Sequence, residues 1–377
     1  MHNSGANIKL LICVNVDWFF LSHRLPLALA AKEQGYEVHI AAADTGKGKE
    51  IEDHGLIFHA LPISRSGTSP LSELKSLKAI YSLYKRLKPE IIHQVSMKPV
   101  IYGSIVTRLF GIRTINAISG MGYIFTKGRI SLVQALMKQM MKWGWNQKMH
   151  LIFQNEDDLA QCRELGLLNT KIKPVLIKGS GVDLNLFQFS DLPANNPLKI
   201  VFPARMLHDK GLVEFIEAAQ ILAKKWSGKI LFQLAGMVDK ENPTNIQEEE
   251  LRAWEVPGYI EWLGFVSDMR SLYKTAELVV LPSYREGLPK SLIEAMAIGR
   301  PIITTDTIGC REVVQPNYNG LLVPIMDGKA LANAIEQLLI SRETRVEMGL
   351  ASRKMAEEEF SLEGVILKHL ELYAGEE

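Results

Sequence analysis

Short apolar runs alternate along the chain with longer amphipathic or polar stretches. In the first half these runs have the length of buried strands and occupy residues 8–16, 37–42, 56–61, 90–95, 112–118, 150–154 and 174–177. The second half repeats the pattern at residues 199–203, 229–235, 260–266, 278–281, 302–305 and 319–323. Because strands that alternate with helices pair in parallel, the pattern predicts an α/β protein whose doubly wound sheets carry helices on both faces.

The length of 377 residues suits two α/β domains better than a single core. The polar, proline-containing stretch 190–197 has the composition of a linker, so we place the first domain at residues 1–189 and the second at 197–355. The apolar fraction of 47% with 23% charged residues is typical of a soluble globular protein. No apolar run approaches the roughly 20 residues that a helix needs to cross a bilayer.

The first apolar run and the cysteines both fit a protein of the cytoplasm. The run is short, ends at Asp17 and lacks a small-residue cleavage site, so we interpret it as a first strand rather than a signal peptide. Cys13, Cys162 and Cys310 are widely spaced, which argues against a disulfide framework or a zinc site.

The net charge of +1 conceals two oppositely charged halves. Residues 1–190 hold 23 Lys and Arg against 14 Asp and Glu, a net charge of +9, whereas residues 191–377 have a net charge of −8. No acidic residue occurs between Glu90 and Glu156, a segment that carries eight cations. The two halves are therefore expected to bind different partners.

The stretch 281–301 has the pattern of a strand, a tight turn and a helix start near Pro289. A helix start carries partial positive charge and unpaired N–H groups, and Gly287 lets the backbone approach a ligand, so a phosphate can bind here. Glu286 and Glu294 flank this position with carboxylates that can accept hydrogen bonds from sugar hydroxyls. Taken alone, two glutamates at this spacing are more often a solvated helix face.

A second strand-to-helix loop follows residues 199–203 and carries Arg205 and Lys210. Their cations can converge on a diphosphate at a helix start. In isolation such a loop is more often simply solvated.

The string around both glutamates resembles the nucleotide-sugar signature of the retaining glycosyltransferases of family four. In that family a Glu, seven residues and a second Glu are followed by Gly-x-Pro or Gly-x-Ala. The matching positions here are Glu286, Gly287, Pro289, Glu294, Ala295 and Gly299. Residues 204–211 resemble the family's Gly-Arg-x-x-x-x-Lys-Gly, with Ala204 in place of the first glycine, and residues 181–187 match its Gly-Val-Asp-x-x-x-Phe.

This resemblance implies the GT-B fold, in which two Rossmann-like doubly wound domains face each other across a cleft. The first domain would bind the acceptor and the second the nucleotide sugar, and the C-terminal helix, here residues 356–377, would return to the first domain. The resemblance also implies that a sugar moves from a nucleotide diphosphate to an acceptor hydroxyl with retained anomeric configuration. No enzyme nucleophile is required by that arrangement.

Each matching residue acquires an expected role. Arg205 and Lys210 would stabilise the departing diphosphate, Glu286 would hold donor hydroxyls and steady positive charge on the sugar ring, and Glu294 would bind the ribose. The remaining donor-binding candidates are Ser283, Gly287, Leu288, Pro289, Gly236, Phe265 and Val266. No Asp-x-Asp occurs in the chain, so neither a metal nor another cofactor is expected.

Acceptor-side candidates lie after strands of the first half, at the sheet edge where doubly wound folds bind ligands. His23 and Arg24 follow the first strand, with the equally weighted alternative that His23 is a helix-start residue bonded to backbone. His93 and Lys98 lie at the end of the run 90–95.

The loop that ends in Gly120 and Gly122 commonly carries a catalytic His in the family. No His lies between residues 94 and 149, so His93 or the backbone of these two glycines are the candidates for that role. The third glycine of a dinucleotide fingerprint would fall at Phe125, which disfavours an oxidoreductase.

Residues 127–148 combine Leu, Met and Trp with cations and contain no acid. A basic amphipathic helix with Trp143 and Trp145 can lie on an anionic membrane surface. The alternative is an ordinary helix whose Met and Trp pack in the core, but it does not explain the missing acids. We therefore favour contact with a membrane surface.

The sequence features and the resemblance lead to one functional hypothesis. The His-Arg-x-Pro start, the Ser-Gly-Met-Gly loop and the Glu-Gly-x-Pro motif resemble those of bacterial family-four enzymes that extend undecaprenyl-diphosphate-linked sugars. This resemblance implies a bacterial enzyme that moves a sugar, from a UDP-linked hexose or N-acetylhexosamine, to an undecaprenyl-diphosphate-linked sugar in surface glycan synthesis. It would work in the cytoplasm at the inner face of the plasma membrane and would not bind nucleic acid. The alternatives are the same fold acting on a soluble oligosaccharide acceptor, and a nucleotide-sugar-binding module without turnover.

Overall fold

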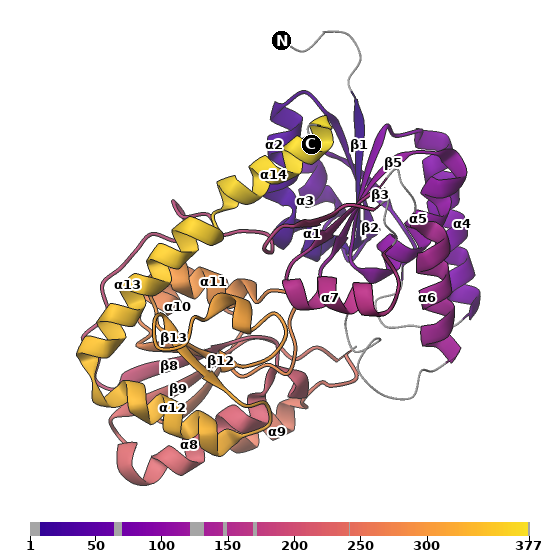
Figure 1. Cartoon of the computed structure of the whole chain (residues 1–377). Coiled ribbons are helices and arrows are strands. Elements are labelled where there is room, and N and C mark those ends of the chain that lie inside the picture. Colours follow the sequence, from indigo (N-terminus) through magenta and orange to yellow (C-terminus); the bar gives the residue numbers. More distant parts are fainter. Residues whose placement is uncertain are drawn as a thin grey trace. The chain divides into compact units, whose positions relative to one another are not determined.

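The computed structural model describes residues 8–63, 70–120, 132–145, 149–168, 172–240 and 242–375. The chain divides into two compact units, which we call unit 1 (Met1–Ser180 with Val365–Glu377) and unit 2 (Gly181–Gly364). Each unit is built on its own parallel sheet with helices packed against it (Figure 1). The predicted α/β class with two parallel sheets is confirmed.

Unit 1 contains a seven-stranded sheet in the order β3-β2-β1-β4-β5-β6-β7, and every pairing is parallel. Its strands are β1 (Lys9–Val16), β2 (Glu37–Ala43), β3 (Ile57–Ala60), β4 (Ile91–Val95), β5 (Arg113–Ile118), β6 (Met149–Phe153) and β7 (Pro174–Leu176). Its helices are α1 (Asp17–His23), α2 (Leu25–Glu33), α3 (Gly48–Asp53), α4 (Pro70–Leu87), α5 (Met97–Phe110), α6 (Leu132–Gly144) and α7 (Glu156–Glu164). The strand order reverses between β1 and β4.

Unit 2 contains a six-stranded parallel sheet in the order β10-β9-β8-β11-β12-β13. Its strands are β8 (Leu198–Pro203), β9 (Ile230–Ala235), β10 (Ile260–Gly264), β11 (Leu278–Leu281), β12 (Ile302–Thr305) and β13 (Gly320–Val323). Its helical elements are η2 (His208–Lys210), α8 (Leu212–Trp226), α9 (Glu248–Trp254), α10 (Met269–Lys274), α11 (Lys290–Ala297), η3 (Arg311–Val313), α12 (Gly328–Ile340) and α13 (Arg342–Glu359). Here the order reverses between β8 and β11.

Helix α14 (Leu362–Ala374) begins in unit 2 and continues into unit 1. Its residues Val365, Leu372 and Tyr373 join the apolar core beneath β1 and β4. The guanidinium of Arg113 donates to the carbonyl oxygens of Leu372 and Tyr373 and so holds the end of the helix.

The division between the units lies after Ser180, rather than after residue 189 as composition suggested. Val182 pairs with the segment before α14, because its N–H donates to the Phe360 carbonyl at 2.8 Å and its carbonyl accepts from Leu362 N–H at 2.9 Å. The expected linker 190–197 is also held against unit 2. Arg300 donates to the carbonyls of residues 190 and 191, and Arg342 to those of residues 192 and 193.

None of the helices in the described ranges is both long and apolar enough to span a bilayer.

Candidate active site

The candidate site lies in unit 2 at the carboxyl ends of β8 and β11, where the strand order reverses and open α/β sheets bind their ligands. The loop 204–211 follows β8, and the loop 282–289 follows β11. The two loops are joined directly, because Tyr284 N–H donates to the Asp209 carbonyl at 2.9 Å and Ser283 Oγ donates to the same carbonyl at 3.1 Å.

Gly211 permits this close approach. It has a φ of +74°, and a Cβ at this position would lie 2.0 Å from the Pro282 carbonyl oxygen. Only glycine combines that backbone conformation with the missing side chain.

Lys210 and Glu286 form the central ion pair of the site. Lys210 Nζ lies 2.5 Å from Glu286 Oε1, and the two side chains are only 17% and 15% exposed. The sequence placed both residues in the site but did not predict that they would contact each other. The pair brings a cation and a carboxylate together at the junction of the two loops.

The loop that carries Glu286 is fixed from its other side by residues that follow β12. Glu286 N–H donates to the Ile308 carbonyl at 3.1 Å, and Thr307 Oγ1 donates to the Tyr284 carbonyl at 3.0 Å. Gly309 lies so close that a Cβ there would be 2.3 Å from the Glu286 carbonyl oxygen. The position of the carboxylate is therefore set by three strand ends.

The helix start beside this pair is Pro289, which caps α11 and is followed by Lys290. The first N–H groups of a helix have no partner within the helix, and its dipole places partial positive charge there. Gly287 and Leu288 form the backbone immediately before the cap, and Leu288 packs against the unit 2 core. The helix start and Lys210 thus bring positive potential to one place, as a diphosphate requires.

Glu294 lies one turn into α11, 3.4 Å from Lys290 Nζ. Burial raises the pKa of its carboxyl above the ordinary value, and Lys290 opposes that shift. A carboxylate in this enclosed position gains from hydrogen-bond donors such as ribose hydroxyls.

Arg205 contacts Asp239 in the loop after β9, and its side chain is 41% exposed. That loop is itself tied to the loop 204–211, since Ile246 N–H donates to the Met206 carbonyl and His208 N–H to the Thr244 carbonyl. Sequence analysis did not point to Asp239, because 34 residues separate it from Arg205.

The remaining donor-side candidates differ in how they are placed. Ser283 is fully buried, and its hydroxyl contacts the backbone carbonyls of Asp209 and Arg285, so its side chain supports the loop. Gly236 allows β9 to pass close to the β8 loop, where a Cβ would lie 1.8 Å from the Ala204 carbonyl oxygen. Phe265 is 72% exposed, and Val266 beside it is half-buried at the end of β10.

In unit 1, His23 and Arg24 lie between α1 and α2. The His23 ring stacks on Phe19 with centroids 4.3 Å apart, and its Nδ1 lies 2.7 Å from Ser22 Oγ. Arg24 is buried and donates to the His23 carbonyl at 3.1 Å. Burial lowers the pKa of Arg24 to about 10, and Tyr373 acts in the opposite direction.

His93 lies inside unit 1 rather than at an open edge of its sheet. Its side chain is fully buried, its Nδ1 lies 2.7 Å from the Tyr373 hydroxyl, and its ring packs against His369. Burial, with smaller effects of His369 and Arg24, lowers the pKa of His93 well below its ordinary value. The predicted acceptor-side role does not fit this placement, because α14 covers the imidazole, which the local sequence pattern does not reveal.

Lys98 lies in the first turn of α5, with its Nζ 2.7 Å from Glu73 Oε1 of α4. Gly120 ends a described segment with a φ of +115°, and Gly122 lies outside the described residues. In the part of the chain that the structure describes, no group of three or more His, Cys, Asp or Glu is arranged to hold a metal ion.

Comparison with known proteins places these features in a family. Residues 9–155 match the family described as "Glycosyl transferase 4-like", and residues 186–355 match "Glycosyl transferases group 1". EpsD of Bacillus subtilis, which has been assigned as a glycosyltransferase, is 30% identical over 367 residues that cover 92% of each chain. This chain is a family-four glycosyltransferase of the GT-B type.

Two other similarities extend over nearly the whole glycosyltransferase. The N,N'-diacetylbacillosaminyl-diphospho-undecaprenol alpha-1,3-N-acetylgalactosaminyltransferase of Campylobacter jejuni is 29% identical, covering 87% of this chain and 91% of its own. The structure of HepE from Anabaena in complex with UDP and glucose superposes with a TM-score of 0.79 over 98% of this chain and 100% of that chain, at 16% identity. At 16% identity, the similarity to HepE shows a shared fold only.

Proposed function

We propose that this glycosyltransferase moves a sugar from a UDP-linked hexose or N-acetylhexosamine onto an undecaprenyl-diphosphate-linked sugar, with retention of the anomeric configuration. The observation that carries the proposal is the Lys210–Glu286 pair beside the start of α11. It supplies a cation, a helix start and a carboxylate where a nucleotide diphosphate and its sugar need them.

Binding of the donor requires an exchange of partners at the phosphate site. Lys210 is paired with Glu286 and Arg205 with Asp239, so both cations start with a neutralising carboxylate. The diphosphate takes the place of one or both carboxylates around the cations. Glu286, released from Lys210, then has its oxygens available for hydroxyls of the donor sugar.

The transfer step needs stabilisation mainly of the leaving group. The bond between the anomeric carbon and the diphosphate oxygen breaks, and its electron pair remains on the diphosphate. Lys210 and the α11 dipole stabilise the charge that develops there. The acceptor oxygen forms the new bond on the same face of the sugar and gives its proton to the leaving phosphate oxygen. The products are UDP and the extended acceptor.

The acceptor class is supported by the relative from Campylobacter jejuni, whose name specifies a diphospho-undecaprenol sugar, and by HepE, which binds UDP and glucose. The charge of +9 over residues 1–190 suits an anionic, lipid-linked acceptor. We propose that the enzyme works in the cytoplasm at the inner face of the membrane, with residues 127–148 in contact with it.

We also propose that transfer needs no divalent cation, since Lys210, Arg205 and the α11 start can balance the diphosphate charge. The test is transfer in the presence of EDTA, which we expect to proceed at an unchanged rate. A rate that falls with EDTA and returns with Mg²⁺ or Mn²⁺ would overturn this part.

The function is tested by incubating the enzyme with UDP-, GDP- and ADP-sugars and a polyprenyl-diphosphate sugar, and by following sugar into the organic phase. We expect transfer from a UDP-sugar, lost on Glu294→Ala, with the anomeric configuration of the product identical to that of the donor by NMR. An inverted product would rule out the same-face route. Transfer only to soluble oligosaccharides would rule out the lipid acceptor.

A further inference from the structure

Exposed apolar side chains of unit 1 gather on three of its helices, α4, α5 and α6. Among the described residues of this unit, seven of the eleven exposed large apolar side chains lie there. They are Leu71, Leu74 and Tyr81 of α4, Leu109 and Phe110 of α5, and Leu136 and Trp143 of α6. Trp143 is 46% exposed and Leu109 is 61% exposed, which is costly in water unless another surface covers them.

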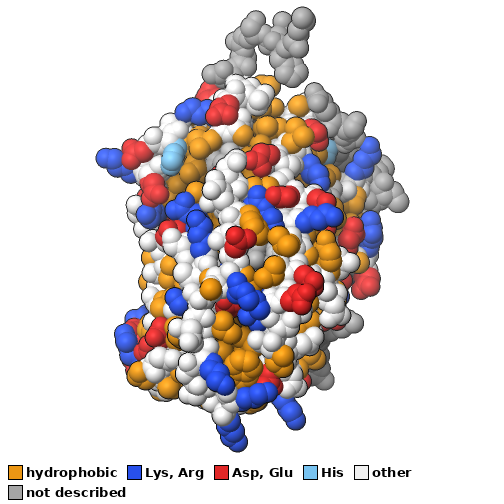
Figure 2. Space-filling model, turned by 90° about the vertical axis from the view of Figure 1, so that its left-hand side faces the viewer, with side chains coloured by type: hydrophobic (Ala, Val, Ile, Leu, Met, Phe, Trp, Pro, Cys, Tyr) orange, Lys and Arg blue, Asp and Glu red, His pale blue; other side chains and the backbone are white. Residues whose placement is uncertain are grey.

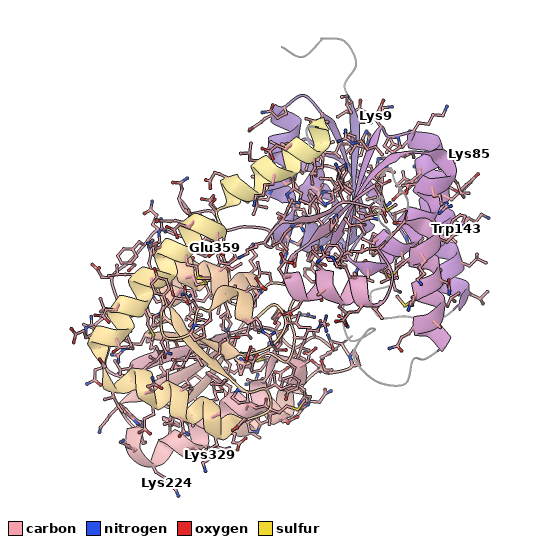
Figure 3. All side chains as sticks on the ribbon, viewed as in Figure 1. Lys9, Lys85, Trp143, Lys224, Lys329 and Glu359 are labelled. Atoms are coloured by element: carbon pink, nitrogen blue, oxygen red, sulfur yellow. The ribbon has the colours of Figure 1, made fainter. Side chains whose placement is uncertain are left out.

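Direct contacts make these three helices one continuous face. The rings of Tyr81 and Phe110 join α4 to α5, with centroids 5.3 Å apart. The guanidinium of Arg108 joins α5 to α6, because it lies 4.9 Å from the Trp143 ring and donates to the Trp143 carbonyl. Figure 1 places α4 and α6 at the same outer edge of the unit, and Figure 3 labels Lys85 and Trp143 along it.

The three helices that carry these apolar side chains are rich in cations. Helices α4, α5 and α6 together carry eight Lys and Arg and one acidic residue, Glu73. Glu73 is neutralised by Lys98 and also accepts from the Tyr102 hydroxyl at 2.7 Å. The face viewed in Figure 2, the left-hand side of Figure 1, instead mixes acidic and basic side chains. With eight cations and one acid, the net charge of α4, α5 and α6 is +7.

We propose that the outer face of α4, α5 and α6 is the surface by which this enzyme docks on an anionic lipid bilayer. The proposal deepens the proposed function and rests on it, because an enzyme whose acceptor stays in a bilayer has to work at the bilayer surface. Exposed Trp, Tyr and Leu enter the headgroup region, while Lys and Arg meet lipid phosphates. The sequence placed this contact in residues 127–148, of which 127–131 and 146–148 lie outside the described residues. Trp143 is exposed, but Trp145, which was also expected at the membrane, is buried in the unit 1 core. The face proposed here instead runs from α6 across α5 to α4.

The test is co-sedimentation with vesicles of phosphatidylcholine alone or of equal parts phosphatidylcholine and phosphatidylglycerol. We expect binding to the anionic vesicles that weakens at high salt. The paired change Lys78→Glu and Lys85→Glu on α4 should weaken it by at least about 25-fold, since each cation near such a surface contributes roughly fivefold. The paired change Leu109→Gln and Trp143→Gln should weaken it by about tenfold.

Matched controls lie on unit 2. Lys224→Glu with Lys329→Glu makes the same charge change, and Ile221→Gln with Ile340→Gln likewise replaces two exposed apolar side chains by Gln. Figure 3 labels both control lysines. These variants should bind anionic vesicles as the unchanged enzyme does.

Four results would overturn the docking face. The first is that the enzyme does not bind anionic vesicles, and the second is that it binds vesicles of phosphatidylcholine alone equally well. The third is that the control variants lose as much vesicle binding as the face variants. The fourth is that the enzyme binds no vesicles but forms a dimer, which Trp143→Gln dissociates. Transfer to acceptor dispersed in detergent separates this proposal from the proposed function. If the face variants transfer normally in detergent but fail on vesicles, both hold. If the enzyme binds anionic vesicles but transfers no sugar to a lipid-linked acceptor, only the proposed function fails.

Discussion

Replacing Lys210 by Met tests whether positive charge at the leaving group drives the reaction. Lys210 Nζ lies beside Glu286 at 2.5 Å, and its side chain is 17% exposed, so the site is partly shielded from water. A unit charge about 4 Å from a phosphate oxygen contributes roughly 4 kcal/mol at the effective dielectric constant of 20 that suits such sites. Part of this stabilisation is offset because Lys210 must first lose its ion pair with Glu286. We therefore expect kcat to fall by about 10²-fold, or close to 3 kcal/mol.

The assay is the initial rate of sugar transfer from the accepted UDP-sugar, with saturating acceptor and increasing donor. Lys210→Arg keeps the charge and should restore part of the lost kcat, whereas the exposed Lys224→Met should leave kcat unchanged. Thermal unfolding of each variant checks that the fold is intact. A Lys210→Met enzyme with an unchanged melting temperature and a kcat within about threefold of the original would refute the reasoning.

Three further predictions follow from other contacts. Glu286→Gln removes the carboxylate that competes with diphosphate for Lys210, so calorimetry should find UDP bound roughly fivefold tighter while transfer is lost. Arg345→Met removes the nearer of two arginine partners of the fully buried Glu277 carboxylate, at 3.0 Å, and leaves only the more exposed Arg342 at 3.8 Å. Denaturant unfolding should therefore find unit 2 less stable by about 3 kcal/mol. Burial lowers the pKa of His369 from 6.5 to about 3 and that of His93 well below 6.5, so both are neutral when folded. Below pH 6.5 these two histidines therefore bind more protons in the unfolded chain than in the folded one. For each histidine, the free energy of unfolding of unit 1 should fall by roughly 1 kcal/mol per pH unit below pH 6.5.

Each of these three predictions is checked by a contradicting outcome or by a control variant. Weaker UDP binding by Glu286→Gln would show that the carboxylate does not compete with diphosphate. Arg270→Met breaks an exposed pair at 2.9 Å and should cost less than about 1 kcal/mol, so an equal cost for Arg345→Met would contradict the buried-charge argument. His369→Gln should flatten the loss of stability between pH 6.5 and 5, while the exposed His54→Gln should not.

The fold was largely predictable because its strands are buried on both faces and therefore appear as continuous apolar runs. The run 278–281 coincides with β11, and the helix expected near Pro289 is α11, which Pro289 caps. The strand order within each sheet is not encoded in such runs. It follows from packing between segments far apart in the sequence.

The site was predictable where its signal is local and not where partners are distant. Glu286 and Glu294 belong to one strand-loop-helix segment, so their spacing made both of them candidates. Asp239 was missed because only the folded β9 loop brings it to Arg205. His93 was assigned to the acceptor side because nothing in β4 reveals that Tyr373, 280 residues later, covers it.

The most direct test of the account is transfer of a radiolabelled sugar from a UDP-sugar into the organic phase by the purified enzyme, with an undecaprenyl-diphosphate sugar as the acceptor. The account predicts labelled lipid with the unchanged enzyme and with Lys224→Met, at least about 10²-fold less with Lys210→Met, and none with Glu294→Ala. Tight UDP binding with no labelled lipid from any UDP-sugar, together with label in soluble oligosaccharides, would contradict it.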